Sequence, residues 1–146
     1  MDIENLLKLL NERNVRYVII GAAAFPIHGY TRATIDFDIF IAADDENAQR
    51  TYDALKEFGY DLSDVALKDM QQTKLLIRQY RLEVDIHPFV SGVEFEDVWE
   101  RRIVGTFGIQ PANFASLEDL IRMKKAAGRT KDKEDLKILL QLKEQK

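Results

Sequence analysis

The stretch TRATIDFDIFI, residues 31–41, decides how the rest of the chain is interpreted, because it sets two aspartates two positions apart within an apolar run. Apolar residues occupy every second position of its second half, and this alternation predicts a β-strand. Asp36 and Asp38 then lie on one face of the strand, with Thr34 beside them and Arg32 as well if the strand begins that early. The opposite face is apolar and is expected to face the core.

The two aspartates need a compensating partner in such a strand. Aspartate is depleted in strands, and a carboxylate beside apolar neighbours carries a heavy desolvation cost. A divalent cation offsets that cost, because Mg²⁺ takes hard oxygen ligands and two carboxylates on one strand face can reach the same ion. Asp36 and Asp38 are therefore candidate metal ligands. The alternative is a solvated strand face with salt bridges.

A third acid occurs in the later segment LEVDIHPF, residues 82–89, where a second alternating pattern places Asp85 on a polar face. If this strand neighbours the first one, the three carboxylates converge. Three carboxylates can hold two metal ions, Mg²⁺ or Mn²⁺, in the arrangement that clamps the attacking and leaving oxygens of a phosphoryl-type transfer. Asp85 is then also a candidate to accept the proton of an incoming hydroxyl. Alternatively, it pairs with Arg78 or Arg81.

A strand, a glycine and a run of helix-forming residues precede the aspartates in VIIGAAAF, residues 18–25. Small residues at the start of a helix let phosphate oxygens approach backbone N–H groups and the positive end of the helix dipole. We therefore expect the turn at Gly21 and Ala22 to hold the phosphates of a nucleotide while the aspartates hold the metal.

Positive charge is concentrated in residues 122–137, although the chain as a whole has a net charge of −4. Lys124 is a candidate contact for a triphosphate, and the alternative is an exposed basic face paired with neighbouring acids. Arg32 either binds a nucleotide phosphate or neutralises the aspartates when no metal is bound, since its guanidinium suits both partners. Thr34, on the same strand face, is a further candidate contact for the nucleotide phosphates. The negative net charge argues against broad electrostatic binding to duplex nucleic acid.

The two histidines are interpreted as structural residues. His28 precedes Gly29 at the predicted end of a short helix, where a histidine satisfied by the helix C-terminus is the commoner case. His87 shares the face of Asp85 but borders Pro88, so we expect a strand-end residue rather than a metal ligand.

The remaining periodicities alternate helices with strands, which predicts an α/β or α+β domain. Residues 60–73 stay undecided between a short helix capped by Ser63 and a loop. The predicted helices cover residues 2–13, 22–29, 45–58, 93–102, 116–127 and 131–146, and the predicted strands cover residues 16–21, 33–42, 74–80, 81–90 and 103–111.

Length and composition fit a single domain over residues 1–146, since 46% of the residues are hydrophobic and a chain of this size can bury a core. The chain contains no cysteine, which excludes a disulfide framework, a thiolate metal site and a thiol nucleophile. No apolar run approaches the roughly 20 residues of a membrane span. We expect a cytoplasmic protein.

Taken together, the glycine turn, the R-x-T-x-D-x-D pattern of residues 32–38 and the later strand aspartate resemble the nucleotidyltransferase superfamily of the DNA polymerase beta type. Three segments look like the small bacterial nucleotidyltransferases associated with abortive infection and toxin–antitoxin systems. They are IIGAAAFPIHGYTRATIDFDIFI (19–41), LEVDIHPF (82–89) and KKAAGRTKDKEDL (124–136).

This resemblance implies a nucleotidyltransferase fold, a mixed β-sheet flanked by helices, and metal-dependent transfer of a nucleoside monophosphate from a nucleoside triphosphate to an acceptor hydroxyl with release of pyrophosphate. It implies that Asp36 and Asp38 are metal ligands, that Asp85 is the third acid, and that Gly21 with Ala22 forms the phosphate-binding turn. The family usually has Gly or Ser where this chain has Ala22. Without that hydroxyl, either backbone amides suffice or activity is reduced.

A second hypothesis belongs to another functional class: a catalytically weak nucleotide-binding or interaction module on the same fold, with a protein partner or a second copy of itself. Ala22 and the minimal core favour it, whereas the three aspartates favour an enzyme. The sequence does not identify the acceptor, which is a tRNA end, a protein side chain or a small molecule.

Overall fold

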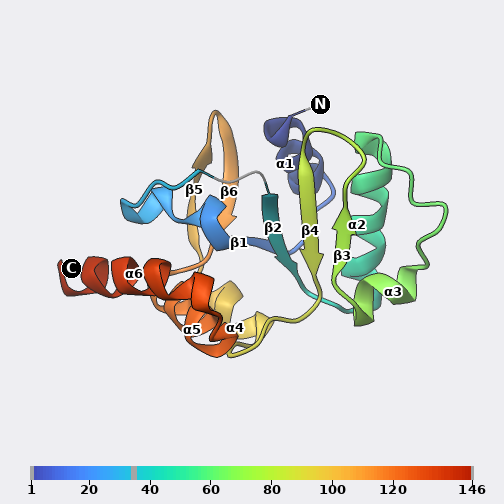
Figure 1. Ribbon diagram of the computed structural model, residues 1–146. Coiled ribbons are helices and arrows are strands. Elements are labelled where there is room, and N and C mark those ends of the chain that lie inside the picture. Colours follow the sequence, from blue (N-terminus) through green and yellow to red (C-terminus); the bar gives the residue numbers. More distant parts are fainter. Residues whose placement is uncertain (1, 34–35, 146) are drawn as a thin grey trace.

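A mixed β-sheet forms the centre of the computed structural model, which describes residues 2–33 and 36–145. Its strands are β1 (Tyr17–Ile20), β2 (Asp36–Ile41), β3 (Leu75–Ile77), β4 (Glu83–His87), β5 (Ile103–Phe107) and β6 (Gln110–Phe114). Their spatial order is β3-β4-β2-β1-β6-β5 (Figure 1). The β1–β6 and β2–β4 pairs are parallel, and the other pairs are antiparallel.

Helices flank this sheet. They are α1 (Ile3–Glu12), α2 (Asp45–Phe58), α3 (Leu67–Gln72), α4 (Phe95–Glu100), α5 (Leu117–Ala127) and α6 (Lys133–Gln145), and three short 3-10 turns are η1 (Gly21–Ala24), η2 (Pro26–His28) and η3 (Thr130–Asp132). In Figure 1, α1 and α2 lie together on one side of the sheet, and α4, α5 and α6 gather below it. Within the described ranges, every helix is too short or too polar to cross a membrane.

Side-chain caps fix where the long helices begin. Asp2, Asp44 and Ser116 each accept a hydrogen bond from the backbone N–H three residues later, at the starts of α1, α2 and α5. Such a cap satisfies one of the backbone donors that a helix leaves unpaired at its first turn. Gly59 and Gly128 end α2 and α5 in the left-handed conformation. The predicted starts and ends of these helices are confirmed.

The apolar face of β2 is buried as its alternation predicts. Phe37, Ile39 and Ile41 are at most 8% exposed, and α1 and α2 pack on this side of the sheet (Figure 1). Fully burying one such side chain stabilises the fold by about 1.5–3 kcal/mol relative to leaving it in water. Strict alternation then directs Asp36 and Asp38 to the opposite face.

Two predicted elements differ from the structure, and the undecided segment 60–73 contains a short helix. Residues 22–29 form the two 3-10 turns η1 and η2 rather than one helix, because Pro26 lacks a backbone N–H and Gly29 turns the chain at φ 97°. The single strand predicted over 103–111 is the hairpin β5–β6, which reverses at Gly108 with φ 61°. In the undecided segment, α3 follows Ala66 rather than Ser63.

Candidate active site

A cleft of about 590 Å³ opens between the polar face of β2 and β4, the η1 turn, and the segment α5–η3–α6. Its lining brings together predicted site residues from distant parts of the chain. These are Gly21, Ala22, Arg32, Asp36, Asp38, Asp85 and Lys124. Thr34, for which phosphate binding is predicted, lies outside the described residues.

The β2–β4 pairing decides which acids meet. The strands are parallel neighbours, with Asp38 opposite Asp85 and Asp36 opposite Glu83. The condition for convergence of the acids, that the two strands be adjacent, is therefore met. Ligand atoms of Asp38, Asp85 and a third residue, His87, lie within 4.8 Å of one another.

His87 is the last residue of β4, as predicted, and its side chain also lies beside the acids of the cleft. Its Nε2 lies 2.8 Å from Oδ1 of Asp38, a hydrogen bond that the imidazole donates to the carboxylate. The side chain is only 15% exposed, so it is directed into the cleft, which it lines. The available signal was the spacing of Asp85 and His87 on one strand face, which repeats the spacing of Asp36 and Asp38.

Asp85 is buried, and its carboxylate is compensated by cations. Nη1 of Arg78 donates a hydrogen bond of 2.7 Å to Oδ1, and Nζ of Lys74 lies 3.9 Å from Oδ2. The pKa of Arg78 is raised, chiefly by this hydrogen bond to Asp85. Arg78, one of the two arginines named as alternative partners, thus pairs with Asp85, and the role of Asp85 as a metal ligand stays a prediction.

Asp36 lies two register pairs away from the Asp38–Asp85 pair, beside Glu83. Its hydrogen bond with Glu83, followed by burial, raises the pKa of the Glu83 carboxyl. Among the described residues, the group of possible ligands within 4.8 Å does not include Asp36. Its role as a metal ligand stays a prediction.

The η1 turn packs against Asp38. Gly21 has φ 69°, and a Cβ at this position would lie 2.6 Å from Oδ2 of Asp38. Ile20, the residue before it, is the register partner of Asp38 across β1 and β2. Only a residue without a side chain lets the turn and the carboxylate approach this closely. Ala22 follows in the lining of the cleft.

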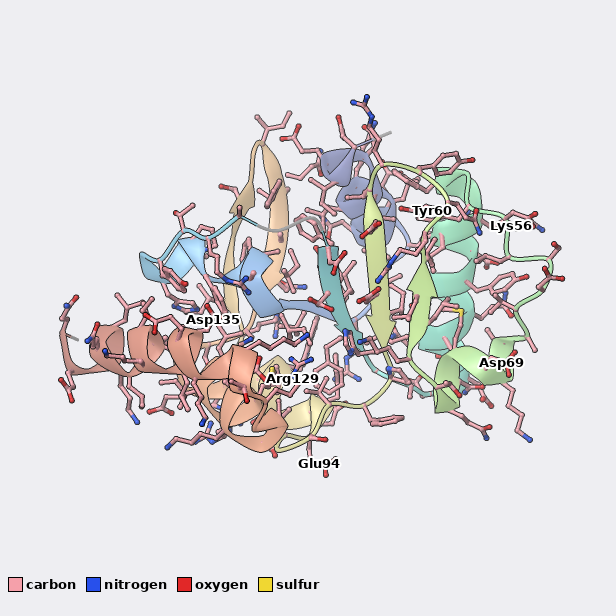
Figure 2. All side chains as sticks on the ribbon, viewed as in Figure 1. Lys56, Tyr60, Asp69, Glu94, Arg129 and Asp135 are labelled. Atoms are coloured by element: carbon pink, nitrogen blue, oxygen red, sulfur yellow. The ribbon has the colours of Figure 1, made fainter. Side chains whose placement is uncertain are left out.

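Cations held by two buried acids form the opposite wall. Lys124 lies 2.9 Å from Asp132 and 3.3 Å from Asp135. Arg129 also pairs with Asp132, at 2.7 Å, and Arg32 pairs with Asp135 at 3.1 Å. Figure 2 shows Arg129 and Asp135 between the C-terminal helices and the sheet.

The pairing between Asp132 and its cations shifts the pKa of Asp132 and of Arg129. Burial alone would raise the pKa of Asp132, but hydrogen bonds from Arg129 and Lys124 outweigh burial and hold it well below its usual range. The hydrogen bond with Asp132 raises the pKa of Arg129, and attraction by Asp38 adds to it. Arg129 is thus electrostatically coupled to the carboxylates across the cleft. Lys124 lines the cleft and is paired with acids, but its side chain is only 14% exposed, so it is not part of the exposed basic face offered as the alternative.

His28 has a structural role, as expected. It is buried, and its Nε2 is hydrogen bonded to the carbonyl oxygen of Ala115 at 2.8 Å. This bond ties η2 to the residue that follows β6.

Comparisons with known proteins agree with this geometry. A family profile described as a nucleotidyltransferase of unknown function (DUF6036) matches residues 1–141. The solved structure of a candidate nucleotidyltransferase from Thermotoga maritima is similar with a TM-score of 0.64 at 17% identity, over 95% of this chain and 90% of that chain. No curated protein matches the sequence. At this identity the likeness establishes the fold, and the predicted mixed sheet flanked by helices is confirmed.

Proposed function

The chain belongs to the family of nucleotidyltransferases of unknown function, and we propose that it catalyses metal-dependent transfer of a nucleoside monophosphate from a nucleoside triphosphate to an acceptor hydroxyl. The observation that carries this proposal is the register of Asp38 opposite Asp85 on two adjacent parallel strands. Two carboxylates meet there at the floor of a cleft whose other wall is cationic.

The donor set fits a divalent cation. Two carboxylates and an imidazole offer ligand atoms within 4.8 Å of one another, and the bare backbone of Gly21 leaves room beside Asp38. Asp38 and Asp85 would hold the ion, with Asp36 as a further ligand along β2. When bound, Mg²⁺ or Mn²⁺ would act as a Lewis acid on the phosphoryl oxygens and orient the triphosphate.

The protein's own residues then bind the substrate and move one proton. Lys124 and Arg129 contact the triphosphate, since their pairing with Asp132 fixes them on the wall of the cleft. Backbone N–H groups of Gly21 and Ala22 approach the phosphates. The acceptor oxygen attacks the α-phosphorus, the bond to pyrophosphate breaks, and Asp85 accepts the hydroxyl proton. Preorganised charge of this kind supplies much of the rate enhancement of enzymes.

A second candidate function is a nucleotide-binding module without turnover, acting with a protein partner as in toxin–antitoxin pairs. One observation favours it: Arg78 and His87 already bind oxygens of Asp85 and Asp38. A cation must displace these partners or share the carboxylates with them.

The test is titration of ATP, GTP, CTP and UTP with Mg²⁺ or Mn²⁺, together with an assay of pyrophosphate release. We compare the wild type with Asp38→Asn, which removes one ligand charge, and with Asp53→Asn on α2, which does not line the cleft. Metal-dependent binding and pyrophosphate release that only Asp38→Asn abolishes would support the enzyme. Binding without turnover on any acceptor would favour the module, and turnover retained in Asp38→Asn would overturn the proposed function.

A further inference from the structure

We propose that His87 is itself a metal ligand and that it makes this site prefer a transition-metal ion, such as Mn²⁺, over Mg²⁺. The inference deepens the proposed function and rests on it only in requiring that the cleft bind a cation. The inference concerns which ion the site holds and which atoms coordinate it. Metal-binding measurements test it without an assay of turnover.

The geometry directs the imidazole to the cation site. Residues 85 and 87 share one face of β4, and the strand register brings this face beside that of β2. Nε2 of His87 already lies 2.8 Å from a carboxylate oxygen of Asp38. Metal–ligand distances of about 2.1 Å require ligand atoms about 3–4 Å apart. Ligand atoms of Asp38, Asp85 and His87 within 4.8 Å of one another can therefore close on one ion by small side-chain rotations. The ring proton then sits on Nδ1, so that Nε2 presents its lone pair to the ion.

The chemistry of the three donors sets the preference. Mg²⁺ favours oxygen ligands and gives up its water reluctantly. Imidazole nitrogen is a softer donor, and the affinity of nitrogen-containing sites rises along the first transition series from Mn²⁺ onward. Exchanging one oxygen ligand for nitrogen therefore favours a transition metal. Neutral imidazole adds this donor without adding charge, so the two carboxylates alone balance the charge of the ion.

A competing role for His87 is to orient Asp38 through their hydrogen bond without touching the ion. Both roles predict weaker metal binding when His87 is removed, so affinity alone does not separate them. A test for nitrogen coordination separates the two roles, because a coordinated nitrogen nucleus couples magnetically to the unpaired electrons of bound Mn²⁺. His28 is the chain's other histidine, and it is bound to Ala115 rather than lining the cleft.

The first experiment is calorimetric titration of MnCl₂ and MgCl₂ into the wild type and His87→Gln, with and without a non-hydrolysable nucleoside triphosphate. Glutamine keeps an oxygen near the position of Nε2. We expect the wild type to bind Mn²⁺ at least about 10-fold more tightly than Mg²⁺. In His87→Gln, Mn²⁺ affinity falls about 10-fold or more while Mg²⁺ affinity changes less than about 3-fold. Equal affinities in the wild type, or no metal binding under either condition, overturn the proposal.

The second experiment is electron spin-echo spectroscopy of Mn²⁺ bound to wild-type protein, with natural and ¹⁵N-labelled histidine. We expect nitrogen modulation that changes with the label. Absence of this nitrogen modulation would overturn the ligand role and leave His87 as a positioning residue. This experiment uses only the wild-type protein, so it remains decisive if His87→Gln fails to fold. Nitrogen coordination without pyrophosphate release on any acceptor would count against the proposed function and leave the metal assignment standing.

Discussion

Gly21 and Asp38 are in such close contact that a Cβ at position 21 would lie 2.6 Å from Oδ2 of the aspartate. The glycine also has φ 69°, where a side chain is strained. The η1 turn, proposed to bind phosphate, and strand β2, proposed to bind the metal, are therefore in tight contact. A change in the turn displaces the carboxylate.

Gly21→Ala tests this coupling. We expect the free energy of unfolding to fall by about 1–2 kcal/mol from backbone strain, and cation affinity to fall about 10-fold or more because Asp38 is pushed aside. Urea unfolding and Mn²⁺ titration measure the two effects. Gly29→Ala is the matched control, since Gly29 has φ 97° but its Cβ would meet only Leu142, at 3.9 Å. Equal losses of metal affinity in both variants would contradict the coupling.

Arg78→Met removes the closer of the two cations that compensate Asp85 and leaves Lys74 at 3.9 Å. Because the loss of a charged partner from a buried carboxylate is unfavourable, we expect lower stability in the presence of a chelator. We also expect cation affinity to rise several-fold, since the ion no longer competes with the guanidinium. Thermal unfolding with EDTA and with Mn²⁺ gives both quantities. Arg50→Met, which removes an exposed pair with Glu46 on α2, should show neither effect, and unchanged metal affinity in Arg78→Met would contradict the competition.

The acids of the cleft could be recognised from sequence because they break a strict local alternation. Asp36 and Asp38 interrupt an apolar strand, and Asp85 interrupts another, so the candidates follow from strand periodicity alone. The adjacency of β2 and β4 could not be derived this way, because 41 residues separate the two strands in the chain. The position of His87 opposite Phe40 depends on that long-range register.

Local backbone conformation limited the other predictions. Helix-forming alanines predict a helix over 22–29, but the positive φ angles of Gly21 and Gly29 and the missing N–H of Pro26 leave only 3-10 turns. Gly108 was interpreted as part of a strand, although its left-handed conformation closes a hairpin. In both segments a glycine, which tolerates positive as well as negative φ, adopts the positive φ that tertiary packing requires.

Stability should depend on pH through Asp132. Its folded pKa is held below the unfolded value of about 3.9. Its ionised form therefore stabilises the fold above that unfolded pKa, and this stabilisation is lost as the pH falls through the folded pKa. We expect Asp132→Asn to lower the free energy of unfolding by about 2–3 kcal/mol at pH 6 and by less at pH 3. Urea unfolding at both pH values measures this.

Asp119→Asn is the matched control for that experiment. Asp119 is fully buried, binds Arg101 and Arg122, and has a pKa that these arginines lower against the effect of burial. We expect a similar pH-dependent loss of stability. Only Asp132→Asn should weaken nucleotide binding, because it alone weakens the pairing that holds Arg129 and Lys124 on the wall of the cleft. Equal nucleotide affinity in the two variants would contradict the role of Asp132 in fixing these cations.

Ala22→Ser tests whether the missing hydroxyl limits the site. Ala22 lines the cleft directly after Gly21, so a serine there can donate a hydrogen bond to a phosphate oxygen. One such bond to a charged group contributes about 1.5 kcal/mol, or roughly 10-fold in affinity. We expect nucleotide affinity to rise about 3- to 10-fold in the calorimetric titration. Ala23→Ser, at the next position of the same turn, should bring no gain, because Ala23 does not line the cleft. An unchanged affinity in Ala22→Ser would mean that backbone N–H groups already satisfy the phosphates.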